Sequence, residues 1–158
     1  MSERRLGAVV SGWALLGVAA VLASAVYRLG GRGLDAIQGG LDGFQWFALI
    51  LLTVGFVYTE GVRTLDRKWV PTVVERARRL REQNIVFWIL APLYGLSLVG
   101  TERKELLRGW LGTAAIVVMV LIVRAFPSPW RGIVDFAVAA ALLWGVLAIL
   151  RRVPAAVR

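Results

Sequence analysis

Long apolar runs separated by short polar segments dominate the chain. The runs cover about 6–27, 44–60, 110–124 and 132–150. A bilayer core of about 30 Å needs roughly 20 apolar residues, because an α-helix rises about 1.5 Å per residue. The pattern therefore predicts an all-α, polytopic transmembrane helical bundle, a single membrane domain with four full spans.

A fifth apolar segment, at about 85–100, is shorter and contains two helix-disrupting residues. Pro92 removes a backbone donor and disfavours helix at the preceding residue, and Gly95 permits a reversal of the chain. The segment is either a kinked span or a re-entrant segment that enters the membrane and returns on the same side.

The segment from about 69 to 83 predicts an amphipathic helix. Its apolar residues recur at helical spacing and form one stripe, and its other face carries Arg76, Arg78, Arg79 and Arg81. A basic amphipathic helix beside a span typically lies in the headgroup layer. We expect these arginines to anchor and orient the helix at anionic lipid headgroups; specific docking of an anionic lipid or a partner is the alternative.

Composition separates the chain from soluble domains. Of its 158 residues, 58% are hydrophobic and 18% are charged, whereas soluble domains are about 45–50% apolar and about 25% charged. This excludes a soluble enzyme and a disordered chain. The absence of histidine and cysteine excludes imidazole- or thiolate-ligated metals and the usual nucleophile pairs. We expect no cofactor, no metal site, no nucleic-acid partner and no enzymatic activity.

Basic residues orient the predicted helices, because they accumulate in short cytoplasmic loops. If 85–100 does not cross the membrane, 15 of the 19 Lys and Arg residues lie on one side; if it crosses, the two sides hold 11 and 8. The first arrangement segregates charge better and places both termini in the cytoplasm. The glycine-rich segment 29–43 is then a flexible outer connector, with a phosphate-cradling loop as the alternative.

Ionisable residues inside or beside the spans are the candidate functional residues. Glu60 follows the second span, with Arg63 at i+3, and Asp135 lies near the outer start of the last span, with Arg131 at i−4. Each pair is either a structural ion pair or a site that handles protons or ions. The two carboxylates fall at opposite faces in this topology, so we do not expect them to form one acid/base pair.

Small residues share one face of the last predicted span: Ala137, Ala141 and Gly145. Such ladders let helix backbones approach closely. This ladder packs either inside one bundle or against a second copy or a larger complex.

The strings Glu60-Gly61-Val62-Arg63 and Pro129-Trp130-Arg131-Gly132-Ile133-Val134-Asp135 resemble those of a group of uncharacterised small bacterial multi-pass membrane proteins. The resemblance covers the second span to the last. It implies a location in a bacterial inner membrane and implies no activity.

The function that we expect is that of a non-catalytic membrane subunit, which packs helices, binds lipid, or joins a homo-oligomer or larger complex. One alternative is a small oligomeric channel or transporter for an ion or solute, with Glu60 and Asp135 near its mouths. Another is an intramembrane enzyme that acts on lipid headgroups.

Overall fold

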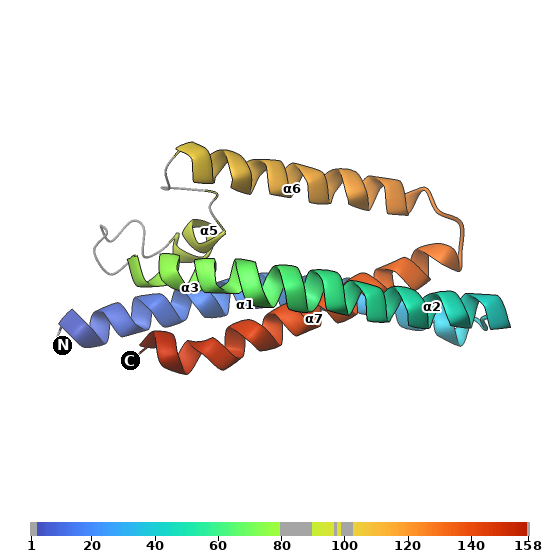
Figure 1. The fold of residues 1–158 in the computed structure, drawn as a ribbon, viewed down its shortest axis with the longest axis horizontal. Helices are drawn as coiled ribbons and strands as arrows, with labels where there is room; N and C mark the ends of the chain where they lie inside the picture. Colours follow the sequence, from blue (N-terminus) through green and yellow to red (C-terminus); the bar gives the residue numbers. More distant parts are fainter. Residues whose placement is uncertain (1–2, 80–89, 97, 99–102, 158) are drawn as a thin grey trace.

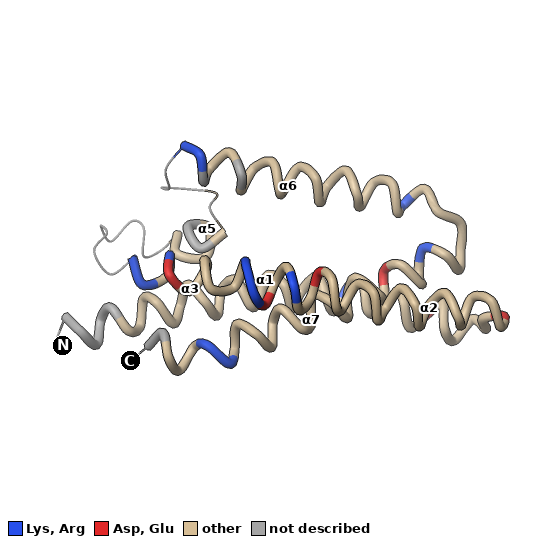
Figure 2. The backbone as a smooth tube through the Cα atoms, viewed as in Figure 1, with Lys and Arg blue, Asp and Glu red and all other residues tan. Residues whose placement is uncertain are grey.

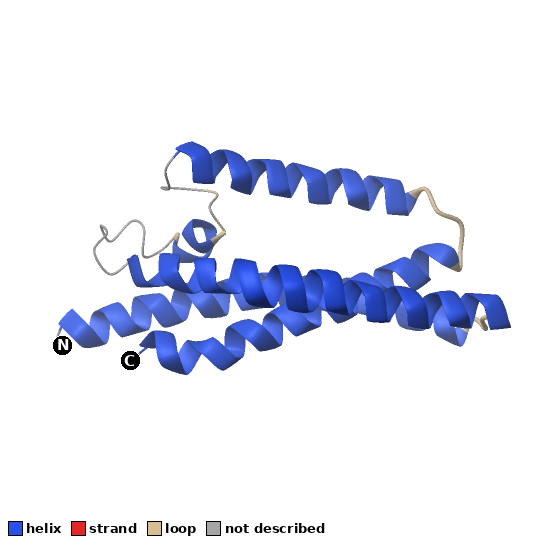
Figure 3. Cartoon of the chain, viewed as in Figure 1, coloured by secondary structure: helices blue, strands red, loops and turns tan. Residues whose placement is uncertain are grey.

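The computed structural model describes residues 3–79, 90–96, 98 and 103–157. These residues are helical apart from short turns, and no strand occurs among them (Figure 3). In chain order the helices are α1 (Glu3–Gln38), α2 (Gly43–Phe56), η1 (Val57–Trp69), α3 (Val70–Arg79), α5 (Ala91–Gly95), α6 (Arg103–Arg124) and α7 (Trp130–Val157).

Four helical segments run alternately along the long axis of the molecule (Figure 1). α1 and α6 run in one direction, and α7 and the segment from α2 to α3 run in the other. Both chain ends, the end of α3 and the start of α6 therefore lie together, at what we call the terminal end. The turns 39–42 and 125–129 lie at the opposite end, the turn end. The chain leaves α3 and enters α6 at the same end.

The apolar core lies in the terminal half, where α1, α3, α5 and α7 meet. Leu15 of α1, Val73 of α3 and Ile149 of α7 are fully buried. The hydroxyl of Ser11 donates a hydrogen bond of 2.9 Å to the backbone carbonyl of Ala77, which also fixes α3 against α1. The core therefore joins elements from both ends of the sequence.

The placement predicted for the amphipathic helix is wrong. α2 continues without a break through η1, a π-helix, into α3, and the apolar stripe packs on α1, α5 and α7 instead of facing lipid. Pro71 lies inside this continuous helix and does not end it, although proline has no N–H for the helical hydrogen bond. Of the predicted 69–83, residues 80–83 lie outside the described residues.

The flexible connector predicted at 29–43 is largely helical. α1 continues to Gln38, and only 39–42 form a turn, in which Gly40 has a φ of 87°. That backbone conformation favours glycine over other residues. Gly33 instead serves helix packing, because a Cβ at this position would overlap Phe136 of α7.

Among the residues that the structure describes, three helices are long and apolar enough to cross a membrane: Ala8–Gln38, Gly43–Arg79 and Trp130–Ala155. The apolar part of α6, Gly109–Arg124, is shorter, so only three of the four predicted spans reach this length. α6 also has sparse contacts with the other described helices, and most of its large apolar side chains are exposed.

Candidate functional site

A buried carboxylate lies between two arginines near the turn end. Asp135 of α7 is 5% exposed, and its Oδ2 lies 3.7 Å from Nη1 of Arg32 and 3.9 Å from Nε of Arg131. Both are ion-pair distances, yet this oxygen accepts no hydrogen bond within the described residues. The i−4 pair predicted from the sequence is present, and the partner from α1 was not predicted.

Small residues bring α1 and α7 close enough for these pairs. A Cβ at Gly132 would overlap Ala36 of α1, just as one at Gly33 would overlap Phe136. Arg32 directly precedes Gly33, so this close approach places its side chain beside α7. Glycine and alanine at a helix crossing are what such a close approach requires.

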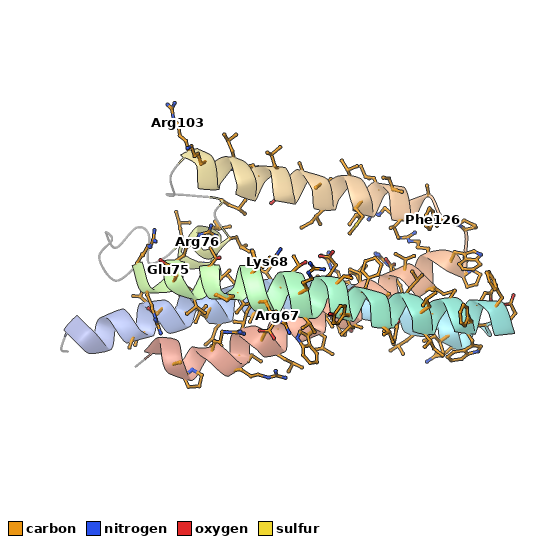
Figure 4. All side chains as sticks on the ribbon, viewed as in Figure 1. Arg67, Lys68, Glu75, Arg76, Arg103 and Phe126 are labelled. Carbon is orange, nitrogen blue, oxygen red and sulfur yellow. The ribbon has the colours of Figure 1, made fainter. Side chains whose placement is uncertain are left out.

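An open cavity of about 500 Å³ lies beside this cluster, at the turn end. Phe126, which Figure 4 labels near the end of α6, contributes to its wall. Arg32 and Arg131 line both this cavity and a narrow crevice of about 40 Å³, whereas Asp135 lines only the crevice. The two arginines therefore border both spaces, and the carboxylate borders the crevice.

A second polar cluster joins η1 to α7 nearer the terminal end. Oδ1 of Asp66 lies 2.6 Å from Nη1 of Arg152, and Nε1 of Trp144 donates to Oδ2 of Asp66 at 3.4 Å. Arg152 also donates to the backbone carbonyls of Asp66 at 3.3 Å and Ala148 at 3.1 Å. Asp66 and Arg152 are 86 positions apart, so no spacing rule could have paired them.

Glu60 and Arg63 are both exposed, and no ion pair between them is found, although both are described. The hydrogen bonds of a π-helix run to i+5, so residues three apart no longer share one face. Next to Glu60, Gly61 faces Ala141 of α7. Ala141 is six residues, or about 9 Å, along α7 from Asp135. The two acids therefore lie nearer one another along the bundle than two pore mouths would.

The arginines of α3 lie at the terminal end, where Arg78 and Arg79 are exposed and Arg76 is half-buried. Nη2 of Arg78 donates to the backbone carbonyl of Ala155 at 3.0 Å, and Arg79 pairs with Glu75 at 2.7 Å. Arg81 lies outside the described residues. Figure 2 shows other basic residues at this end, and in Figure 4 Arg103 at the start of α6 extends away from the bundle.

The ladder of small residues on α7 is used within the chain. Ala137, Ala141 and Gly145 are buried. Gly145 faces Leu65 of η1, because a Cβ there would lie 2.9 Å from the side chain of Leu65. Of the two predicted alternatives, packing inside one bundle is the one that the structure contains.

The predicted helix break is a short helix. Pro92 and Gly95 both belong to α5, in which Pro92 is the second residue and fits the first turn. Pro92 faces Gly17 of α1, where a Cβ would overlap the proline ring. α5 is therefore docked on α1 in the terminal half; residues 85–89 lie outside the described residues.

No group of three or more acidic residues that could hold a metal ion occurs in the described part of the chain. No family model, curated protein or solved structure matches the chain.

Proposed function

We propose that the protein is a non-catalytic integral membrane protein that binds anionic lipid headgroups through the outward basic residues of η1 and α3. This basic face comprises Arg63, Arg67, Lys68, Arg76, Arg78 and Arg79. One observation carries the proposal. Along one continuous helix, α2 exposes large apolar side chains, and η1 and α3 expose charged ones.

The length of this helix supports the proposal. It has 37 residues, which is more than the roughly 20 residues that cross a bilayer core. The exposed apolar side chains of α2 include Phe44, Phe47, Ile50 and Val54, and such side chains are stable in hydrocarbon. With α2 in the hydrocarbon, the charged residues of η1 and α3 lie towards the headgroups of the leaflet at the terminal end.

The orientation of the protein in the membrane follows from the same basic residues. Under the positive-inside rule, the terminal end with its basic face lies in the cytoplasm, and so do both termini. The resemblance of the Glu60–Arg63 string adds the bacterial inner membrane as the location.

Asp66 and Asp135 lie in separate clusters, each beside an arginine. This arrangement suits helix packing better than acid/base catalysis.

The test is the preference for an anionic lipid. Native mass spectrometry of the detergent-solubilised protein compares binding of phosphatidylglycerol with binding of phosphatidylcholine. The double variant Arg67→Gln/Lys68→Gln should lose about tenfold or more of this preference, because each basic residue near an anionic surface contributes about 1 kcal/mol. The control variant Arg28→Gln removes an exposed charge of α1 outside the basic face and should keep the preference. A double variant with undiminished preference would overturn the proposal.

A further inference from the structure

We propose that the turn-end cavity binds a phospholipid, whose phosphate is held by Arg32 and Arg131. The inference goes beyond the proposed function. Neither arginine belongs to the basic face, and the cavity lies at the opposite end of the molecule. Basic pockets between transmembrane helices bind anionic lipid headgroups on the cytoplasmic side of membranes, and the same chemistry is available to a lipid of the opposite leaflet.

The guanidinium groups of Arg32 and Arg131 have N–H donors that can bind a further acceptor. A guanidinium carries five N–H donors, and the contacts of Arg32 and Arg131 with Asp135, at 3.7 and 3.9 Å, exceed hydrogen-bond length. A phosphate accepts such donors in pairs, through short charge-assisted hydrogen bonds.

Asp135 holds the side chains of Arg32 and Arg131 beside each other. Two like charges side by side repel each other, and the buried carboxylate between them offsets this repulsion. Arg32 and Arg131 line the cavity and Asp135 does not. An anion in the cavity can therefore contact the two guanidinium groups without displacing the carboxylate of Asp135.

An apolar crevice adjoins the cavity and distinguishes a lipid from a small anion. Arg32 and Arg131 line both spaces. The apolar residues of the crevice come from α1, α6 and α7: Leu29, Met119, Val120, Val123, Val134 and Val138. A phosphate site continued by an apolar crevice matches a headgroup followed by an acyl chain.

The crevice is narrow, so an acyl chain enters it only if α6 moves outward. α6 has sparse contacts with the other described helices, so this movement breaks few of them. Inside the membrane this movement costs little free energy, because the lipid chains that replace the lost helix contacts are as apolar as the helix surface.

Aromatic side chains indicate that the cavity lies at the depth of the lipid headgroups. The rings of Phe44 and Trp130 pack edge to face at the turn end, with their centroids 5.9 Å apart. Tryptophan is enriched at the level of the headgroups. The phosphate group of a lipid in that leaflet would lie near the same level.

The experiment uses the full chain in phosphatidylcholine vesicles that contain a trace of photoactivatable phosphatidylglycerol with a diazirine in its acyl chain. Because the exposed residues of α6 also meet bulk lipid, the labelling that counts is the part that excess unlabelled phosphatidylglycerol removes. Peptide mapping identifies the cross-linked residues. The wild type should label peptides from 119–138. Arg32→Gln/Arg131→Gln should reduce that labelling about tenfold, the effect of losing about 1.4 kcal/mol of binding, and should keep any labelling near η1. Unchanged labelling of 119–138 would overturn the inference.

A second variant tests the inference in case the double arginine variant does not fold. Val138→Phe fills the crevice and leaves both arginines and Asp135 in place, and it should also reduce the labelling of 119–138. Labelling that survives this substitution contradicts the lipid assignment.

Inorganic phosphate is the competing probe, with sodium chloride of equal ionic strength as its control. Phosphate should reduce the labelling of 119–138 more than chloride does, because it competes with the lipid phosphate for Arg32 and Arg131. Equal labelling in the two salts would contradict a site that binds the phosphate group. The proposed function is unaffected by these outcomes, since its variants lie at η1.

Discussion

At the scale of single residues, the buried polar groups of this chain occur where helices meet. Asp66 faces Arg152 and Trp144 across the contact of η1 with α7, and Asp135 faces Arg32 across the contact of α1 with α7. A buried charge is costly unless a partner compensates it. Each carboxylate therefore favours one particular arrangement of the two helices that contact it.

The cluster around Asp66 gives the first prediction. Asp66→Asn removes the charge that Arg152 contacts at 2.6 Å and leaves that guanidinium partly buried. We expect a loss of about 1–2 kcal/mol in the free energy of unfolding, near the value of a hydrogen bond to a charged group. Thermal melting in mild detergent measures it. Glu75→Gln is the matched control, because its pair with Arg79 is largely exposed and contributes little. Equal melting temperatures for the two variants would contradict the role given to Asp66.

Sequence spacing could predict only the local part of these clusters. Arg131 and Asp135 are four apart on one helix, and helical periodicity is enough to pair them. Arg32 and Asp66 find their partners only after α7 has packed on α1 and η1. Those partners depend on tertiary structure, which no repeat in the sequence reports.

At the scale of elements, the continuous helix from α2 to α3 is the main departure from expectation. The periodicity of 69–83 correctly indicated an apolar stripe, as Val70, Val73 and Ala77 are buried. An amphipathic stripe, however, packs equally well on lipid and on protein. Its partner was decided by the α1, α5 and α7 surfaces that surround it, and these are distant in sequence.

Docking of α3 on the bundle gives the second prediction. Val73→Ala should lower the free energy of unfolding by about 1–3 kcal/mol, because the substitution leaves a small cavity in a fully buried site. Val54→Ala, on the same continuous helix, changes a side chain that is 64% exposed and should leave the melting temperature nearly unchanged. Both are read from thermal melting in mild detergent. A Val73→Ala protein as stable as the wild type would indicate that α3 lies apart from the bundle.

At the scale of the whole molecule, the exposed surface changes along the long axis. Apolar side chains of α2 and α6 are exposed over much of its length, whereas the charged side chains of η1 and α3 gather towards the terminal end (Figures 2 and 4). Composition and the distribution of arginines were enough to predict a helical membrane protein. They could not predict that α6 would stand apart from the bundle, since its apolar residues suit lipid and protein equally.

The most direct test of this account is the side of the membrane on which each end lies. The chain has no cysteine, so single substitutions can be labelled with a membrane-impermeant maleimide in right-side-out and inverted vesicles. Glu75→Cys and Ala155→Cys, at the terminal end, should react only in inverted vesicles. Gly40→Cys and Ser128→Cys, at the turn end, should react only in right-side-out vesicles. Reaction of the Glu75 and Ala155 variants from opposite sides, or of all four variants from one side, would contradict the proposed arrangement in the membrane.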